Sequence, residues 1–387
     1  MDTDLTFVAV TPYSLLKSRT GGIIGRILAL GGDVRFVGAR MYAPSDDMVD
    51  AWLKTLEAED LPDVMANALR GYVDENLRPD NPFGISNRMM MLLFEGSDPL
   101  RSLLEGVVGE MTFDVRGNTI RGTYGDFVFR DGELSFFEPS VLMPGTPAAN
   151  AAQLKMLRDF AMKDGGILTD VVKYEDPSVV QTTLVIIKPD NFLRRSTRPG
   201  NIIDMCSRGG LFSVGTRMLQ RSQEDAEEGY GPLRNIFIEK LRGRVADRAG
   251  DGLASVFEFA ITDDMQEKVA DILKAANAEH EFRKITNYMT GQDEAGAQLP
   301  PEERGKCLAL LYQGPNAIER IRGRLGATNP DEAEAGTIRS IYGYDLMKNG
   351  AHASDSPQSA ERERKIVGLW EEGESCDFKD VIERHLG

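Results

Sequence analysis

Residues 183–189 read T-L-V-I-I-K-P, and residues 6–12 read T-F-V-A-V-T-P. The two stretches match at an offset of 177, and V-G-A-R-M at 37–41 matches V-G-T-R-M at 214–218 at the same offset. Similar stretches that recur in the same order indicate an internal repeat. The first strand of each copy and the segment that follows it are therefore expected to be built alike.

A third match lies near the end of each copy and shows that the second copy contains an insertion. T-I-R-G-T-Y-G at 119–125 matches T-I-R-S-I-Y-G at 337–343, now at an offset of 218. The difference between 218 and 177 means that the second copy carries 41 extra residues between these landmarks. We expect two related domains, residues 1–178 and residues 179–387, with the insertion around residues 251–304.

Each copy has the same alternation of short apolar runs and amphipathic stretches. In the first copy the pattern predicts strands at Leu5–Val10, Val34–Met41 and Met89–Phe94, and helices at Gly22–Leu30, Asp46–Leu56, Leu61–Asn76 and Pro99–Val108. In the second copy it predicts strands at Thr182–Ile187, Leu211–Leu219 and Cys307–Tyr312, and helices at Gly200–Ser207, Gln223–Arg248 and Pro315–Leu325. Near-continuous apolar strands are typical of a sheet centre. The fold class predicted is α/β, an α+β sandwich in which helices cover a mostly antiparallel sheet.

Three further segments complete the expected organisation. Ala148–Met162 is interpreted as the first-copy counterpart of the helix that begins near residue 357. Within the insertion, Asp263–Ala278 has the pattern of a charged amphipathic helix, and Gly291–Glu303 has the Gly and Pro content of an exposed loop.

Composition excludes several classes of function. The net charge of −16 argues against a general grip on nucleic-acid phosphates, which needs a basic surface. The three cysteines, Cys206, Cys307 and Cys376, are too few and too scattered for a disulfide framework or a zinc site, and they fit a reducing compartment. The longest apolar run, Met89–Phe94, is too short to cross a membrane. We expect a soluble cytoplasmic protein that binds neither nucleic acid nor membrane.

Residues 349–363, N-G-A-H-A-S-D-S-P-Q-S-A-E-R-E, contain the strongest chemical signal. His352, one of three histidines, is flanked by small residues. Ser356 is a good N-cap and Pro357 suits the first helical position, so the histidine precedes a helix N-terminus, which favours an anion. Glu363 lies two turns along that helix and can face back toward the loop. A neutral imidazole held by a carboxylate suits a nucleophile that accepts a phosphoryl group, whereas the alternative is an ordinary surface histidine.

Basic residues in the second copy could form a phosphate grip around this histidine. They are Lys188 at the end of the first strand, Arg322 and Arg324 near a helix end, and Arg339. The first copy serves as an internal control: Thr11 replaces Lys188, Arg121 matches Arg339, and the offset of 218 places Leu134 where His352 stands. Joint loss of the charged set from one copy is what a single shared site predicts.

Three motifs together resemble the nucleoside diphosphate kinase family. They are L-V-I-I-K-P-D at 184–190, G-A-T-N-P-D-E-A-E-A-G-T-I-R at 326–339 and the histidine motif at 349–363, in the order of the family. The resemblance covers Gln181–Gly387 apart from the inserted part, and covers Met1–Met162 only faintly. It implies two ferredoxin-like domains and a two-step exchange, in which a nucleoside triphosphate with Mg²⁺ on its phosphates phosphorylates a histidine that then phosphorylates a nucleoside diphosphate.

Carried over by motif, the resemblance makes His352 the phosphorylated nucleophile and Glu363 the residue that orients its ring. Lys188 and Asn349 would contact the ribose hydroxyl and the phosphates. The phosphate grip would come from Arg322, Thr328 and Arg339. Tyr230 and Ser354 are further candidates, for a tyrosine near the histidine and for a support of the histidine loop.

The sequence departs from the family pattern at specific places. Ala353 follows the histidine where glycine is usual, and Asn191 follows K-P-D where glycine is usual, so we expect Asn191 in a left-handed turn. The insertion falls where the family closes its base-binding helical hairpin and makes subunit contacts. The assembly is therefore left open between a homo-oligomer and an intramolecular pseudo-dimer. Two other functions also stay open: a non-catalytic nucleotide-binding scaffold, and a phosphocarrier that passes phosphate from histidine to a protein.

Overall fold

The computed structural model describes residues 3–113, 117–169, 172–219, 233–292, 296–297, 299, 306–370 and 376–386. The chain divides into two units. The first consists of Met1–Leu219 and Leu308–Gly387 and holds both sequence copies, and the second is Gln220–Cys307. We call the part from β1 to α7 copy one and the part from β8 to α14 copy two.

The sheet of copy one has the strand order β6-β1-β3-β2-β7. Its strands are β1 (Asp4–Val10), β2 (Arg35–Tyr42), β3 (Met89–Gly96), β6 (Val141–Leu142) and β7 (Gly165–Gly166). All the pairings in this sheet are antiparallel. β1 and β3 are buried along almost their whole length, as their continuous apolar sequences predict.

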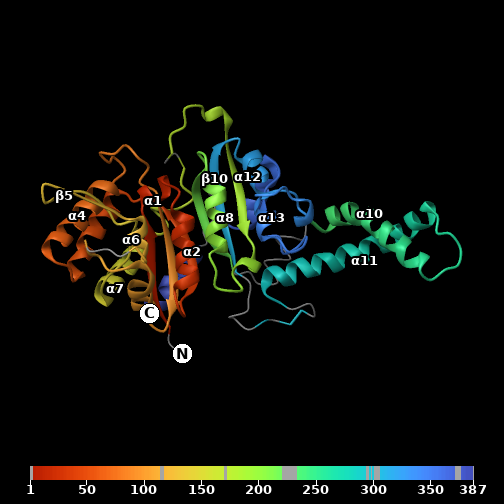
Figure 1. The fold of residues 1–387 in the computed structure, drawn as a ribbon, viewed down its shortest axis with the longest axis horizontal. Helices are drawn as coiled ribbons and strands as arrows, with labels where there is room; N and C mark the ends of the chain where they lie inside the picture. The colour runs from red at the N-terminus through yellow and green to blue at the C-terminus, as the bar shows by residue number, and fades with distance from the viewer. Residues whose placement is uncertain are drawn as a thin grey trace. The chain divides into compact units, whose positions relative to one another are not determined.

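Helices cover both faces of this sheet (Figure 1). They are α1 (Pro12–Leu16), α2 (Thr20–Leu30), α3 (Asp46–Thr55), α4 (Asp63–Asn76), α5 (Pro99–Leu103), α6 (Ile120–Tyr124) and α7 (Pro147–Phe160), with short turns η1 (Leu56–Ala58) and η2 (Leu104–Val108). The predicted helices are confirmed, including the counterpart helix at α7, except that Pro99–Val108 changes to wider π-type turns from Leu104.

One element of copy one lies outside every prediction. β4 (Asp126–Arg130) and β5 (Glu133–Glu138) form a separate antiparallel hairpin. Its turn residues, Asp131 and Gly132, both have positive φ, at 53° and 85°. Asp-Gly is the pair that such tight hairpin turns prefer, because both positions require the left-handed region.

The sheet of copy two has the order β11-β8-β10-β9. Its strands are β8 (Val180–Ile187), β9 (Phe212–Leu219), β10 (Cys307–Pro315) and β11 (Ala351–Ala353). The helices of copy two are α8 (Arg198–Ser207), α12 (Ala317–Leu325), α13 (Ile338–Tyr342) and α14 (Pro357–Ile366). Its short turns are η3 (Pro177–Val179), η4 (Pro189–Asn191) and η5 (Pro330–Glu332). Both sheets place the fourth strand beside the first, then the third and the second. The predicted fold class, ferredoxin-like antiparallel sheets covered by helices, is confirmed.

The extra residues of copy two lie between β9 and β10. They belong to the second unit, which contains α10 (Leu233–Ala254) and α11 (Asp263–Thr290) packed against each other. α11 is twelve residues longer than the predicted helix, and it ends at Gly291, which adopts the left-handed conformation of a helix stop. Most of the predicted loop at Gly291–Glu303 lies outside the described residues.

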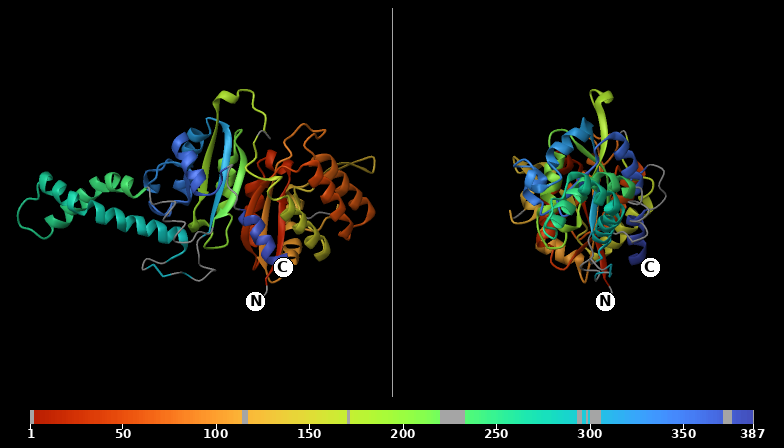
Figure 2. Two further views of the ribbon diagram at one scale, coloured as in Figure 1. Left: turned by 180° about the vertical axis from the view of Figure 1, so that it is seen from behind. Right: turned by 90° about the vertical axis from the view of Figure 1, so that its right-hand side faces the viewer.

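The last helix, α15 (Asp377–Leu386), follows copy two in sequence but packs on copy one (Figure 2). Phe378, Val381 and Ile382 are buried in the same apolar cluster as Tyr42 and Leu157 of copy one. The core of copy one is therefore completed by the end of the chain.

The two copies contact each other through α2 and α8, and through β2 and β9. The two helices approach closely at Gly21 and Gly200, where a Cβ atom on either residue would lie 2.2 Å or 2.1 Å from the other's carbonyl oxygen. No helix within the described ranges has both the length and the apolar character needed to span a membrane.

Candidate active site

His352 is placed by the edge strand of copy two. β11 pairs with β8 so that His352 lies opposite Ile186, and its neighbours Ala351 and Ala353 are buried. Because side chains alternate along a strand, burial of these alanines turns the imidazole to the other face. The His352 side chain keeps 40% of its surface exposed. The histidine is thus fixed in the backbone ladder while its ring stays accessible.

Glu363 on α14 holds the ring. Its Oε2 atom lies 2.9 Å from Nε2 of His352 and accepts a hydrogen bond of 2.8 Å from the buried Ser354 hydroxyl. Burial acts to raise the pKa of Glu363, but the hydrogen bonds from His352 and Ser354 outweigh burial and the net pKa is lowered. An ionised Glu363 fixes the proton of His352 on Nε2 and leaves Nδ1 with its lone pair. Within the described part of the chain, Nδ1 has no hydrogen-bond partner.

The predicted helix start is confirmed. Ser356 is the N-cap of α14 and accepts a hydrogen bond from the backbone N–H of Ser359, and Pro357 occupies the first helical position. The cap fixes the first turn of α14, and Glu363 lies six residues beyond Pro357.

Lys188, Asn349 and Thr328 belong to one connected group. The ammonium of Lys188 donates to Asn349 Oδ1 at 2.7 Å and to the carbonyl of Met347 at 2.8 Å. Asn349 is buried and donates from Nδ2 to the backbone carbonyl of Thr328 at 3.0 Å. This bond does not involve the Thr328 side chain, and Thr328 is exposed. The three residues lie on three different loops, and Asn349 joins them.

Arg339 and Arg322 bring two positive charges together. Arg339 donates to the carbonyls of Gly326 and Ala351, so it is anchored beside the histidine strand. Burial and, to a smaller extent, the charge of Arg322 lower the pKa of Arg339 to about 10. Arg322 is exposed and has no ion pair among the described residues. Two neighbouring guanidinium groups without a carboxylate partner are suited to an anion.

The other expected residues have different positions. Arg324 donates to the carbonyls of Cys206 and Arg208 at the end of α8, so the prediction that it belongs to the basic cluster at the site is wrong. Tyr230 lies outside the described residues.

Asn191 does not adopt the left-handed turn that we expected. It ends the short turn η4, and its buried side chain donates to the carbonyl of Gly350 at 2.7 Å. It therefore ties the end of β8 to the histidine loop, a role that its place in the motif did not reveal. Its side-chain amide supplies the tie that a glycine there would lack.

The counterpart of the site in copy one is found from strand register. β6 pairs with β1 so that Leu142 lies opposite Ala9, and the offset of 177 makes Ala9 the equivalent of Ile186. Leu142 therefore stands where His352 stands, and the prediction of Leu134 is wrong, because Leu134 lies in the β5 hairpin. The N-caps Thr146 and Ser356, each followed by proline, agree with the resulting offset of 210.

The same register gives the other equivalences. Gln153 corresponds to Glu363, and its amide donates to Glu59 at 2.9 Å. Thr11 corresponds to Lys188, and both donate a backbone N–H to the residue at the matching place in the histidine loop, Ser140 or Gly350. Copy one therefore retains the backbone of the candidate site without its histidine.

Arg121 of copy one corresponds to Arg339. Arg121 donates to the carbonyl of Gly109 as Arg339 does to that of Gly326, and its second acceptor, Met143, lies two residues beyond the counterpart of Ala351. Burial lowers the pKa of Arg121 to about 10 as well. Each copy thus has an arginine at this position, and in both copies its hydrogen bonds to backbone carbonyls anchor the surrounding loops.

Comparisons with known proteins match part of this chain to nucleoside diphosphate kinases. The nucleoside diphosphate kinase family model matches residues 258–369. A nucleoside diphosphate kinase from Kosmotoga olearia is 40% identical over 54% of this chain and 100% of its own length. One from Archaeoglobus fulgidus is 30% identical over 48% of this chain and 83% of its own length. A solved NDP kinase structure from Pyrobaculum aerophilum shares 27% identity over 50% of this chain and 98% of that one, with a TM-score of 0.35.

Proposed function

Since the chain belongs to the nucleoside diphosphate kinase family, we propose that it transfers the terminal phosphoryl group of a nucleoside triphosphate to a nucleoside diphosphate through a phosphohistidine at His352. The observation that carries this proposal is the His352–Glu363–Ser354 arrangement. Glu363 accepts from Nε2, so Nδ1 of an exposed ring is available as a nucleophile. Similarity to the family alone would not distinguish an active copy from an inactive one.

The reaction would proceed in two displacements. Nδ1 of His352 forms a bond to the terminal phosphorus while the bond to the bridging oxygen breaks and the diphosphate leaves. The Nε2 proton stays on His352, held by Glu363 at 2.9 Å, which stabilises the positive charge on the ring. A nucleoside diphosphate then takes the phosphoryl group by the reverse path. Such transfers depend mainly on positioning and charge stabilisation.

Arg339, Arg322 and Thr328 would hold the phosphate chain, and Lys188 with Asn349 would hold the phosphates and the ribose. Arg339 and Lys188 are already fixed by hydrogen bonds, so little reorganisation is needed when the substrate binds. The donors of the site are cationic or hydroxyl groups, which suit phosphate oxygens rather than a metal. Mg²⁺ would therefore arrive on the phosphates of the nucleotide, where it neutralises part of their charge.

A labelling experiment tests the proposal. The full-length protein is incubated briefly with γ-labelled ATP and Mg²⁺, and then a nucleoside diphosphate is added. We expect acid-labile label on the wild type, its removal by the diphosphate, and no label on His352→Ala. Absence of label on the wild type, or equal label on His352→Ala, would contradict the proposal. Label that leaves only to a protein would favour the phosphocarrier.

We also propose that copies one and two act as an intramolecular pseudo-dimer, because α2 meets α8 and β2 meets β9 within one unit. Sedimentation of the full chain checks this: a monomer that retains full activity is expected. Activity that appears only in a larger assembly would contradict it.

A further inference from the structure

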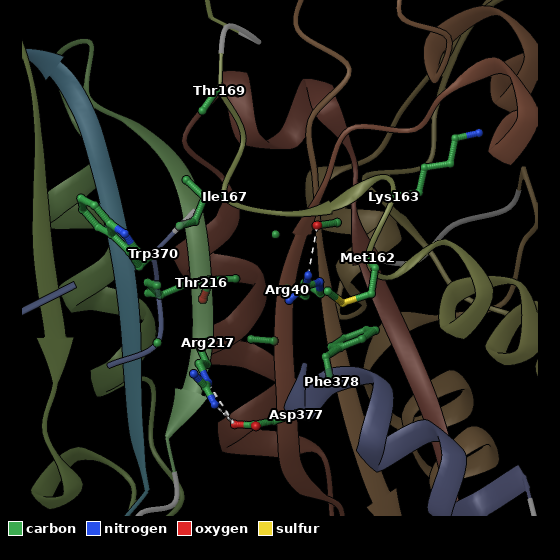
Figure 3. A pocket seen from close by; sticks show the side chains of 15 residues that line it. Arg40, Met162, Lys163, Ile167, Thr169, Thr216, Arg217, Trp370, Asp377 and Phe378 are labelled. Carbon is green, nitrogen blue, oxygen red and sulfur yellow. Dashed lines mark hydrogen bonds and ion pairs between the residues drawn. The ribbon is translucent and has the colours of Figure 1, made fainter. Parts of the chain in front are cut away.

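A cavity of about 380 Å³ lies between β2 and β9, away from the histidine site (Figure 3). Its volume lies within the range of ~300–1,000 Å³ that is typical of small-molecule sites. Most of the lining surface is polar. Arg40 and Arg217, which line it, occupy matching positions of the repeat, in V-G-A-R-M and V-G-T-R-M. The cavity therefore brings together two guanidinium groups, one from each copy.

Room for both head groups is provided by glycines with positive φ. Gly166 has a φ of 131°, and a Cβ there would lie 3.2 Å from Nη2 of Arg40. Gly368 has a φ of 64°, and a Cβ there would lie 1.7 Å from Nη1 of Arg217. A side chain at Gly368 would displace the Arg217 head group, and one at Gly166 would crowd that of Arg40. The backbone at these two glycines thus leaves space for the two guanidinium groups.

The two arginines differ in their charge partners. Arg217 donates to Asp377 at 2.6 Å and 2.9 Å, so its charge is compensated. Arg40 donates only to the carbonyls of Ala161 and Gly165, at 2.9 Å and 3.1 Å, and no carboxylate pairs with it in the described part of the chain.

A third cation at the rim, Lys163, pairs with Asp47 at 2.6 Å, and Figure 3 shows its ammonium directed away from the cavity. Among the described residues that line the cavity, Arg40 thus carries the one uncompensated positive charge.

We propose that this cavity binds a small phosphate, either free or as a phosphomonoester, with Arg40 as its principal contact. Arg40, Arg217 and Thr169 lie on different sides of the cavity (Figure 3), so donors reach a ligand from several directions. A tetrahedral oxyanion can accept from all of them, whereas a planar carboxylate offers fewer directions. The Thr169 hydroxyl at the exposed edge supplies a neutral donor. Because both copies contribute, the ligand would bridge them.

Trp370 lines the cavity and provides a reporter. The only other tryptophan, Trp52, is buried in the core of copy one. The full-length protein is titrated with inorganic phosphate and, separately, with AMP, at constant ionic strength, while tryptophan fluorescence is recorded. We expect a saturable change. Equal affinity for the two probes assigns the site to free phosphate, and tighter binding of AMP assigns it to a phosphomonoester.

Variants decide whether the signal comes from this cavity. Arg40→Gln should weaken binding about tenfold, since a charge-assisted hydrogen bond is lost. Thr169→Glu keeps every hydrogen bond of Arg40 and should also weaken binding, about fivefold by repulsion, whereas the matched Thr169→Gln should not. Lys188→Gln at the histidine site should leave the affinity unchanged. The proposal is overturned by no saturable change with either probe, by unchanged affinity in both Arg40→Gln and Thr169→Glu, or by loss in Lys188→Gln.

Discussion

The two copies share a sheet and an arginine anchor but place different groups at the end of their first strand. In copy two that position carries Lys188, which bonds Asn349. In copy one it carries Thr11, whose hydroxyl donates to the buried Glu138 at 2.8 Å. Tyr72 and the N–H of Ser140 also donate to this carboxylate, at 2.9 Å and 2.8 Å.

This difference predicts that copy one does not hold a phosphate chain as copy two would. A phosphate chain would meet the Glu138 carboxyl group where copy two offers an ammonium. This group supplies no positive charge, and its ionised form, which dominates above a pKa of about 7, repels an anion. The hairpin β4–β5 brings Glu138 into that position. Copy one therefore lacks the histidine and also has an acidic group in place of the ammonium at the equivalent corner.

The largest expected effect is on turnover. If copy one contributes no catalysis, His352→Ala should lower the steady-state exchange rate by about ten-thousand-fold or more, since no second nucleophile replaces it. A coupled assay of nucleoside diphosphate phosphorylation measures this, with the exposed His280→Ala as control. Residual exchange above that level would mean that copy one turns over substrate.

A second prediction concerns the stability of copy one. Phe378 on α15 is 3% exposed and packs on Tyr42 with ring centroids 5.8 Å apart. Phe378→Ala should lower the free energy of unfolding by about 3–5 kcal/mol, because a large buried side chain is removed. Denaturant unfolding measures the change, and the exposed Glu383→Ala should stay within about 0.5 kcal/mol of the wild type. A loss under about 1 kcal/mol would show that α15 is not part of the core.

The packing of α15 in the core of copy one also shows which features the sequence could not predict. Strands, helices and caps follow local patterns, so β1, α14 and the Ser356 cap could be predicted. The docking of α15 on copy one depends on contacts between residues far apart in the sequence, such as Phe378 with Tyr42. A fragment that ends at residue 178 lacks this helix and would expose part of the core.

The candidate site was predictable where a motif is continuous and less so where it spans a loop of variable length. His352 and Glu363 lie eleven residues apart and their contact follows from helix geometry. The counterpart in copy one was misplaced because the hairpin adds eight residues between α6 and β6, and the offset falls from 218 to 210. Strand register identifies Leu142, and in the sequence the offset of 210 is marked by the matching cap and proline pairs, Thr146-Pro147 and Ser356-Pro357.

A third prediction uses the buried carboxylate of copy one. Burial raises the pKa of Glu138 from 4.5 to about 7, although Thr11 and Tyr72 donate to it. The folded state then binds more protons than the unfolded state between pH 4.5 and 7. The free energy of unfolding should fall as the pH rises through this window, by up to about 3 kcal/mol, and level off above it.

Glu138→Gln should flatten this dependence, whereas Glu133→Gln on the exposed part of the same hairpin should not. Denaturant unfolding at several pH values measures both. A slope that survives in Glu138→Gln would assign the titration to another group and weaken the contrast between the copies.

The smallest expected effect concerns the support of His352 by its neighbours. Ser354 donates to Glu363 at 2.8 Å, and copy one has Pro144 at the corresponding position, which has no hydroxyl to donate. Ser354→Ala should lower the exchange rate about tenfold, since one hydrogen bond to a charged group is lost. The same bond helps to lower the pKa of Glu363, so its loss should raise that pKa and move the acidic limb of the pH–rate profile to higher pH. Ser359→Ala on the same helix is the control. A rate loss without movement of the acidic limb would mean that Ser354 acts through packing, and the hydroxyl would then no longer count as a functional difference between copy two and copy one.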